Sequence, residues 1–202
     1  MSKLFSLACE RNREPILMVL RDAFADCKRV LEIGSGTGQH AVFFATQLPH
    51  LVWQTSDLKC NHPSIIAWQQ EAGLTNVRPP LALDANRWTD SATTGKFDAV
   101  FSANTCHIMA WPEVAAMFAG IGQVLSRSGV VCIYGPFNYS GRFTSASNAQ
   151  FDASLKRQAP HMGIRDVETM DALAAAQKLV LQADHAMPAN NRLLVWRADH
   201  LA

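Results

Sequence analysis

The sequence predicts an α/β protein with a seven-stranded, mostly parallel sheet that is flanked by helices and whose last strand is antiparallel. Three observations predict this fold class. Short apolar runs rich in β-branched residues alternate with longer segments of helical composition, as in parallel sheets with crossover helices. A turn with three glycines joins the first apolar run to a helical segment. The last two apolar runs are separated only by the short link 187–191, which indicates antiparallel neighbours.

The length of 202 residues predicts one domain, residues 1–202, that can bury a sizeable core. An N-terminal helical cap is expected over about residues 1–27. A lid insertion is expected over about residues 136–160, because a long polar and aromatic loop there leaves the predicted sheet.

Each element has its own sequence signal. Pro15 is expected in the first turn of an N-terminal amphipathic helix. Pro79 and Pro80 predict that the third strand lies toward the sheet edge with only its second half well paired. Ser147 and Gln150 fit a capping box that opens a helix. Strands are expected at residues 30–33, 51–57, 77–84, 97–103, 130–135, 179–186 and 193–197, and helices at 39–48, 63–72, 112–125, 148–159 and 166–178.

Composition disfavours several classes of function. A formal net charge of +1 gives no electrostatic footprint for nucleic acid. No run approaches 18 apolar residues, so no membrane span is expected. The five cysteines are odd in number and widely spaced, and the seven histidines lack zinc-ligand spacing, which predicts reduced thiols, a cytoplasmic protein and no metal site. The composition permits a homodimer without arguing for one.

The glycine turn is the most informative stretch. Glycines at 34, 36 and 38 follow Glu32 in the pattern Glu-x-Gly-x-Gly-x-Gly. A dinucleotide fingerprint would need its third glycine at Gln39, and no phosphate-loop lysine follows. The pattern resembles motif I of the class I S-adenosylmethionine (SAM) dependent methyltransferases, and a carboxylate at Glu32 suits a cationic ligand. The predicted cofactor residues in this turn are Glu32, Gly34, Ser35, Gly36 and Gly38; the alternative is a strand-to-helix turn that binds nothing.

Further cofactor residues are expected at the ends of the next strands. Asp57 lies 21 residues beyond Gly36 (57 − 36) and ends the second strand, where an acid hydrogen-bonds ribose hydroxyls. The alternative for Asp57 is a helix N-cap. The resemblance implies that Asp84 meets the adenine amino group. The alternative for Asp84 is a turn residue before Asn86, since aspartate is common in turns. The set is completed by Leu58, Ala85 and Asn104.

Two residues are candidates for catalysis. His107 follows the fourth strand at the carboxyl edge of the sheet, where it could act as a general base or bind the substrate. The alternative is a histidine that satisfies a backbone carbonyl. Tyr134, at the end of the fifth strand, is the second candidate. An aromatic lid is expected from Phe137, Tyr139 and Phe143.

The chain as a whole is similar to domain-of-unknown-function family 938, a family of SAM methyltransferase-like proteins. The resemblance implies a Rossmann-like fold and SAM as cofactor, and it names no catalytic residue. It rests on residues 8–16, 36–41, 49–50, 53–57, 76–81, 134–137, 147–155 and 187–191. Polar and aromatic residues in these stretches are expected to converge on the substrate, with Arg11, Asn12, Phe137, Asn148 and Asn190 as candidates.

The predicted function is SAM-dependent methyl transfer to an N, O or S nucleophile of a small molecule by in-line displacement. Two alternatives remain open at this point: a SAM-binding protein without turnover that acts as a partner or regulator, and a methyltransferase acting on protein or RNA. An NAD-type oxidoreductase is disfavoured by the glycine spacing.

Overall fold

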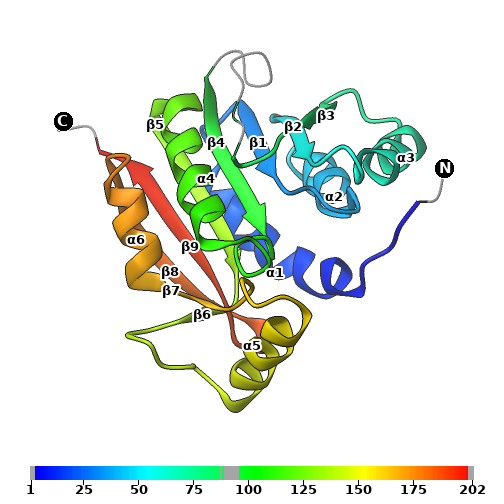
Figure 1. Cartoon of the computed structure of the whole chain (residues 1–202). Helices are drawn as coiled ribbons and strands as arrows, with labels where there is room; N and C mark the ends of the chain where they lie inside the picture. The colour runs from blue at the N-terminus through cyan, green and yellow to red at the C-terminus, as the bar shows by residue number, and fades with distance from the viewer. Residues whose placement is uncertain (1–2, 87, 89–95, 200–202) are drawn as a thin grey trace.

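The computed structural model describes residues 3–86, 88 and 96–199; residues 1–2 of the expected cap lie outside this part of the chain. Within it, seven strands form one sheet in the order β3-β2-β1-β4-β5-β9-β8 (Figure 1). The strands are β1 (Arg29–Ile33), β2 (Val52–Asp57), β3 (Val77–Ala82), β4 (Phe97–Ala103), β5 (Leu125–Gly135), β8 (Leu179–Met187) and β9 (Asn191–Ala198).

The strands β1 to β5 run parallel to one another, and β9 runs antiparallel to both of its neighbours, β5 and β8. The predicted fold class is therefore confirmed: the sheet is mostly parallel and its last strand is antiparallel. A short 3-10 turn, Pro188–Asn190, links β8 to β9.

Helices cover both faces of this sheet. They are α1 (Leu7–Ala23), α2 (Gln39–Gln47), α3 (His62–Ala72), α4 (Trp111–Val124), α5 (Ala146–Gln158) and α6 (Val167–Ala175). Neighbouring strand residues point to opposite faces, so Val30 packs with α1 and α2 while Leu31 packs with α4 and α6. Because both faces are buried, the central strands read as continuous apolar runs rather than as alternating patterns.

Two expectations about helix starts were wrong, and a third, about the pairing of the third strand, was wrong as well. Pro15 lies inside α1 rather than in its first turn, because Ser6 caps the helix and accepts a hydrogen bond from the Cys9 amide. Helix α5 is capped by Ser145, whose Oγ accepts from the Asn148 amide, and not by Ser147.

The third strand lies at the sheet edge, as expected, but both of its halves pair with β2, and the register shifts between them. A small two-stranded sheet of β6 (Phe137–Asn138) and β7 (Arg165–Asp166) was not predicted, because two residues are too few to show a periodicity.

The described cysteines are all free, and no described helix is long and apolar enough to cross a membrane.

Candidate active site

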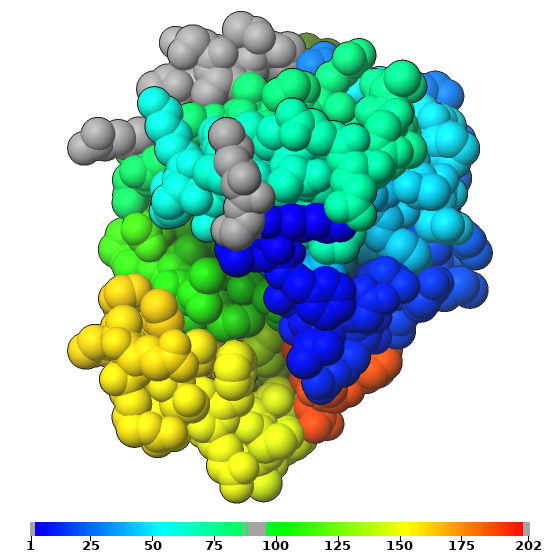
Figure 2. Space-filling model, turned by 90° about the vertical axis from the view of Figure 1, so that its right-hand side faces the viewer, coloured from blue at the N-terminus to red at the C-terminus, as the bar shows by residue number. Residues whose placement is uncertain are grey.

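A cavity of about 940 Å³ opens at the carboxyl edge of the parallel strands. Its wall is formed by the loops that follow β1 to β4, by the start of α1 and by α5. In Figure 2 the blue N-terminal segment lies against the cyan and teal residues around α3, above the yellow residues of α5. Predicted site residues that line the cavity are Arg11, Gly34, Ser35, Gly36, Asp57, Leu58, Asp84, Ala85, Asn104, His107 and Asn148.

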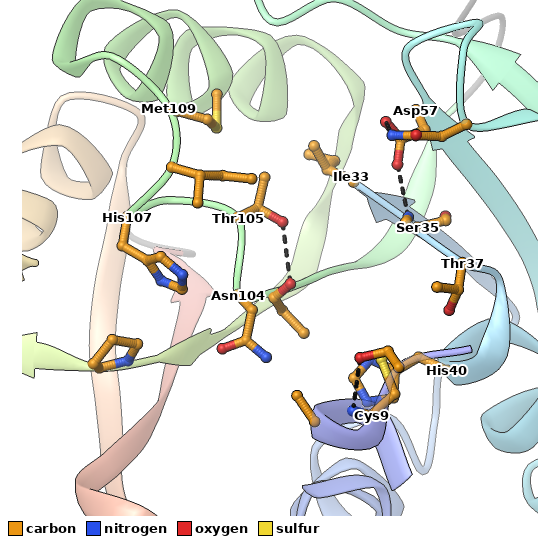
Figure 3. Close-up of a pocket in the computed structure, with 18 of the residues that line it drawn as sticks. Cys9, Ile33, Ser35, Thr37, His40, Asp57, Asn104, Thr105, His107 and Met109 are labelled. Carbon is orange, nitrogen blue, oxygen red and sulfur yellow. Dashed lines mark hydrogen bonds between the residues drawn. The ribbon is translucent and has the colours of Figure 1, made fainter. Parts of the chain in front are cut away.

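The glycine turn is locked by its own hydrogen bonds. The amides of Gly34 and Ser35 both donate to the Ser56 carbonyl at 3.0 Å, and the Gly36 amide donates to Asp57 Oδ2 at 2.6 Å (Figure 3). The amides of these three residues are therefore used within the protein and are not left to meet a ligand. Instead, the bonded turn presents open space: an added Cβ at Gly36, where φ is +56°, would meet no atom within 4 Å.

Two predicted cofactor residues do not line the cavity. Gly38, with φ +94°, caps α2 and lets α3 approach, since a Cβ there would stand 2.9 Å from Ile65 Cα. Glu32 is buried beneath the turn and accepts hydrogen bonds from Ser35 Oγ at 2.8 Å and Trp53 Nε1 at 3.1 Å. Burial raises the pKa of Glu32 to about 7, against the lowering effect of these two donors.

The two aspartates at the strand ends face the cavity and also hold their own loops. Asp57 Oδ1 accepts from the Leu58 amide at 2.7 Å and from Asn61 Nδ2 at 2.8 Å. Asn61, not Asp57, is the N-cap of α3. Asp84 Oδ1 accepts from the Asn86 amide at 2.9 Å, which is the turn contact weighed above, yet Asp84 still lines the cavity.

The loop after β4 carries Asn104 and His107 toward the cavity (Figure 3). Asn104 has a φ of +58°, a backbone conformation that costs energy for a non-glycine residue and that clusters at functional sites. Among the described residues, no protein group hydrogen-bonds the ring nitrogens of His107. The ring packs edge-on against Phe151, with centroids 5.3 Å apart. Burial, and secondarily the Arg165 cation, lower the pKa of His107 to about 4.

A polar network supports the wall opposite the glycine turn. Asn148 Nδ2 donates to Thr144 Oγ1 at 2.9 Å and to the Asn190 carbonyl at 3.1 Å. Asn190 Nδ2 in turn donates to Ser147 Oγ at 3.1 Å. Asn190 therefore does not line the cavity itself; it holds in place the α5 residues that do.

Three other candidates lie behind the cavity wall. Asn12 is buried and its Oδ1 lies 2.7 Å from His40 Nε2, and Tyr134 is buried in the core that α1 and α2 cover. Phe137 is 1% exposed and belongs to the core beneath α4 and α6. These side chains shape the site without facing it, because each is taken up by packing or by a partner within the fold.

The expected aromatic lid does not form over the cavity. Phe137 is in the core, the Tyr139 hydroxyl donates to Asp184 Oδ2 at 2.6 Å, and Phe143 is exposed outside the cavity wall. Aromatic side chains that do line the cavity include Phe151 and Trp88, both of which sequence reasoning missed; Phe151 is the one on α5. Phe151 lies one helical turn after Asn148, so the i, i+3 spacing could have identified it.

Two further cavity residues, Cys9 and His40, were also missed. His40 stacks on Phe44, with ring centroids 5.2 Å apart, and burial lowers the pKa of His40 to about 4. Its Nε2 lies 2.7 Å from Asn12 Oδ1, so His40 joins α2 to α1 beside the cavity. The position of His40, two residues after Gly38 of the glycine turn, was the sequence signal that could have placed it at the cavity.

The fold is that of SAM-dependent methyltransferases. An O-methyltransferase family protein from Burkholderia thailandensis is similar with a TM-score of 0.83, at 16% identity over 96% of this chain. Mitomycin 7-O-methyltransferase MmcR is similar with a TM-score of 0.80, at 13% identity over 95% of this chain. This chain covers 58% and 54% of those two proteins, so it spans somewhat more than half of their length.

A third similar structure is NcsB1, an O-methyltransferase from neocarzinostatin biosynthesis in complex with SAM and 2-hydroxy-5-methyl naphthoic acid. Its TM-score is 0.76 at 14% identity, over 95% of this chain and 55% of NcsB1. At the level of family, residues 3–198 match the family described as "Protein of unknown function (DUF938)". The chain belongs to this family, as its sequence motifs predict.

Proposed function

We propose that this protein binds SAM and transfers its methyl group to a nucleophilic oxygen, nitrogen or sulfur of a small molecule. The observation that carries the proposal is the convergence of the open glycine turn, two strand-end carboxylates and an unpaired histidine on one cavity. A volume of about 940 Å³ lies at the upper end of the usual range for ligand sites. That size suits a cofactor together with a second small molecule.

The residues present fit SAM by their chemistry. When bound, SAM supplies an electrophilic methyl group on a sulfonium. The Asp57 carboxylate would accept a hydrogen bond from a ribose hydroxyl, since a carboxylate has about four acceptor sites and protein donors fill three of them, which leaves one on Oδ2. Asp84 would accept from the adenine amino group through Oδ2, to which no described protein group donates. A cationic ligand above the turn would favour the charged form of Glu32, whose pKa is raised by burial in the ligand-free protein.

His107 is proposed to receive the proton of the nucleophile. Its low pKa keeps the imidazole neutral at pH 7, so a ring nitrogen can accept a hydrogen bond from a hydroxyl or thiol. Burial also keeps water away from the ring. Tyr134 is buried and does not line the cavity, so we propose only a supporting role for it in the wall behind the site.

The class of acceptor is proposed from the wall and from the fold relatives. Phe151, Ile108 and Met109 give the cavity an apolar side, and Asn148 and Arg11 add polar groups. Of the similar structures named above, MmcR is a mitomycin 7-O-methyltransferase and NcsB1 is an O-methyltransferase in complex with a naphthoic acid. We propose a small molecule rather than nucleic acid or a membrane as partner, a cytoplasmic protein, and a homodimer as the assembly to test first.

A thermal-shift experiment tests cofactor binding. SAM at 100 times its Kd is expected to add about 2.7 kcal/mol of stability, or about 5 to 10 °C in Tm, whereas NAD adds nothing. A shift with NAD and none with SAM would contradict the proposal. SAM consumption is then screened over fractionated metabolite extracts. Binding without consumption in any extract would instead support a regulatory SAM-binding protein.

Replacing His107 tests the chemistry separately from binding. His107→Ala is expected to lower the rate of SAM consumption by about 100-fold, in the range of general acid–base contributions, and to leave SAM affinity within twofold. The rate is measured with the extract in which the wild type consumes SAM. The affinity for SAM is measured by calorimetry. An unchanged rate would remove His107 from the catalytic residues.

A further inference from the structure

The loop that carries His107 has no regular secondary structure of its own. It connects β4 to α4 by a turn in which the amides of Ile108 and Met109 donate to the Thr105 carbonyl at 3.0 and 3.3 Å. That leaves the carbonyls of residues 106, 107 and 109 without partners inside the turn. Buried carbonyls of this kind need donors from elsewhere.

The donors come from the segment between α5 and β7. The Gly163 amide donates to the His107 carbonyl at 2.9 Å. Arg165 Nε donates to the Cys106 carbonyl at 3.1 Å, and Arg165 Nη2 donates to the carbonyls of Met109 and, at 3.0 Å, His161. One guanidinium therefore holds the loop on both sides of His107.

Arg165 is itself fixed to the sheet. It pairs with Phe137 in the small two-stranded sheet of β6 and β7. Phe137 directly follows Pro136, which lines the cavity. Its guanidinium carbon lies 5.9 Å from the centre of the Trp111 ring. Among the described residues, no carboxylate forms an ion pair with Arg165, so the fork of the guanidinium is used on backbone carbonyls.

We infer that Arg165 is the positioning residue of His107: its guanidinium holds the carbonyls of Cys106 and Met109 so that the imidazole faces the cavity. The fork geometry is the reason for arginine here. Nε and Nη2 point to two carbonyls three residues apart, which the single ammonium of lysine cannot match. This inference rests on the proposed function only for the task of His107; the contacts themselves hold without any ligand.

Two variants separate the geometry from the charge. Arg165→Lys keeps the positive charge and loses the fork, whereas Arg165→Gln loses both. Arg157→Gln is the matched control, because Arg157 is exposed on the last turn of α5 and does not line the cavity. The hydrogen-exchange and NMR measurements are made on the ligand-free protein, so they do not depend on whether SAM binds.

Amide hydrogen exchange and NMR of the His107 ring report the outcome. Both Arg165 variants are expected to speed amide exchange at residues 105–109 about tenfold or more, because opening of the loop then costs less free energy without the guanidinium contacts to break. Exchange in β1 is expected to stay at the wild-type rate. Both variants are expected to lose the ring-current shift that Phe151 gives His107. Only Arg165→Gln is expected to raise the pKa of His107, because it removes the cation. Arg157→Gln is expected to change none of these.

Two results would overturn the inference. One is wild-type exchange at residues 105–109 in Arg165→Lys. The other needs no variant: an Arg165 Nε–H that exchanges with water as fast as the exposed Arg157 Nε–H in the wild type, which would show that the guanidinium contacts are not made. In the consumption assay, Arg165→Lys is expected to lower the rate about 100-fold at unchanged SAM affinity, as for a misplaced catalytic group. If the wild type does not bind SAM, the proposed function fails while the exchange result still decides the role of Arg165.

Discussion

At the scale of single residues, the site is built from groups that serve the fold and face the cavity at once. Asp57 holds the glycine turn, the start of the next loop and Asn61, yet its carboxylate lines the cavity. Sequence spacing predicted the position of Asp57, and the family resemblance implied that of Asp84. Neither could predict that Asn12, Tyr134 and Phe137 lie behind the wall, because a polar or aromatic residue beside a site is distinguished from one in it only by tertiary packing.

Asp57→Asn is expected to weaken SAM binding about 10- to 100-fold, because hydrogen bonds to a charged acceptor contribute about 1.5 to 3 kcal/mol. Calorimetry with SAM measures the affinity. Asp98→Asn is the matched control: Asp98 Oδ2 also accepts two backbone amides, from Lys28 and Arg29 at 2.9 Å, but Asp98 does not line the cavity. Equal loss of SAM affinity in both variants would contradict the ribose assignment of Asp57.

At the scale of elements, the sequence predicted which segments are helices and strands better than it predicted their ends. Apolar runs buried on both faces identified the central strands, and the short link at 187–191 identified the antiparallel pair. The capping serine of α5 and the place of Pro15 in α1 were missed, because neighbouring serines compete for the cap and a proline is not always at a helix start. The glycine turn was identified by spacing alone, but its three glycines differ in task.

Alanine substitutions distinguish these tasks. Gly36→Ala is expected to cost about 1 to 2 kcal/mol for the left-handed backbone and to weaken SAM binding about tenfold, since the new methyl group stands in open space at the cavity. Gly38→Ala is expected to cost about 2 to 5 kcal/mol, because its Cβ also meets the Ile65 backbone.

Gly73→Ala is the control for backbone strain alone. It has a φ of +62°, no atom within 4 Å of an added Cβ, and a place at the end of α3. Urea unfolding and SAM calorimetry should show that Gly73→Ala matches Gly36→Ala in stability but keeps its SAM affinity. A greater loss of stability in Gly36→Ala than in Gly38→Ala would be inconsistent with the packing role of Gly38.

At the scale of the whole molecule, burial of three titratable groups near the cavity couples stability to pH. The pKa values of His40 and His107 fall from 6.5 to about 4 on folding, and the pKa of Glu32 rises from 4.5 to about 7. Between pH 4.5 and 6.5 the unfolded chain binds two more protons at the histidines and one fewer at Glu32. These groups therefore give a net uptake of one proton on unfolding, and stability rises with pH in this window.

The expected slope from the three groups is about 1.4 kcal/mol per pH unit in the wild type. Glu32→Gln removes the opposing group, so its slope is expected to double to about 2.8 kcal/mol per pH unit. Urea unfolding at pH 4.5, 5.5 and 6.5 measures both slopes. Equal slopes in the two proteins would show that Glu32 is not protonated in the folded state near pH 6.

The strand order has a consequence for how the chain is made. Strand β8 joins the sheet only through β9, which lies between it and β5. During synthesis from the N-terminus, β8 therefore emerges without a partner, and the growing chain exposes the open edge of β5 until β9 is complete. Such an edge is a template for pairing with other chains. The nascent protein is thus expected to be most prone to aggregation in the interval between the synthesis of β5 and that of β9.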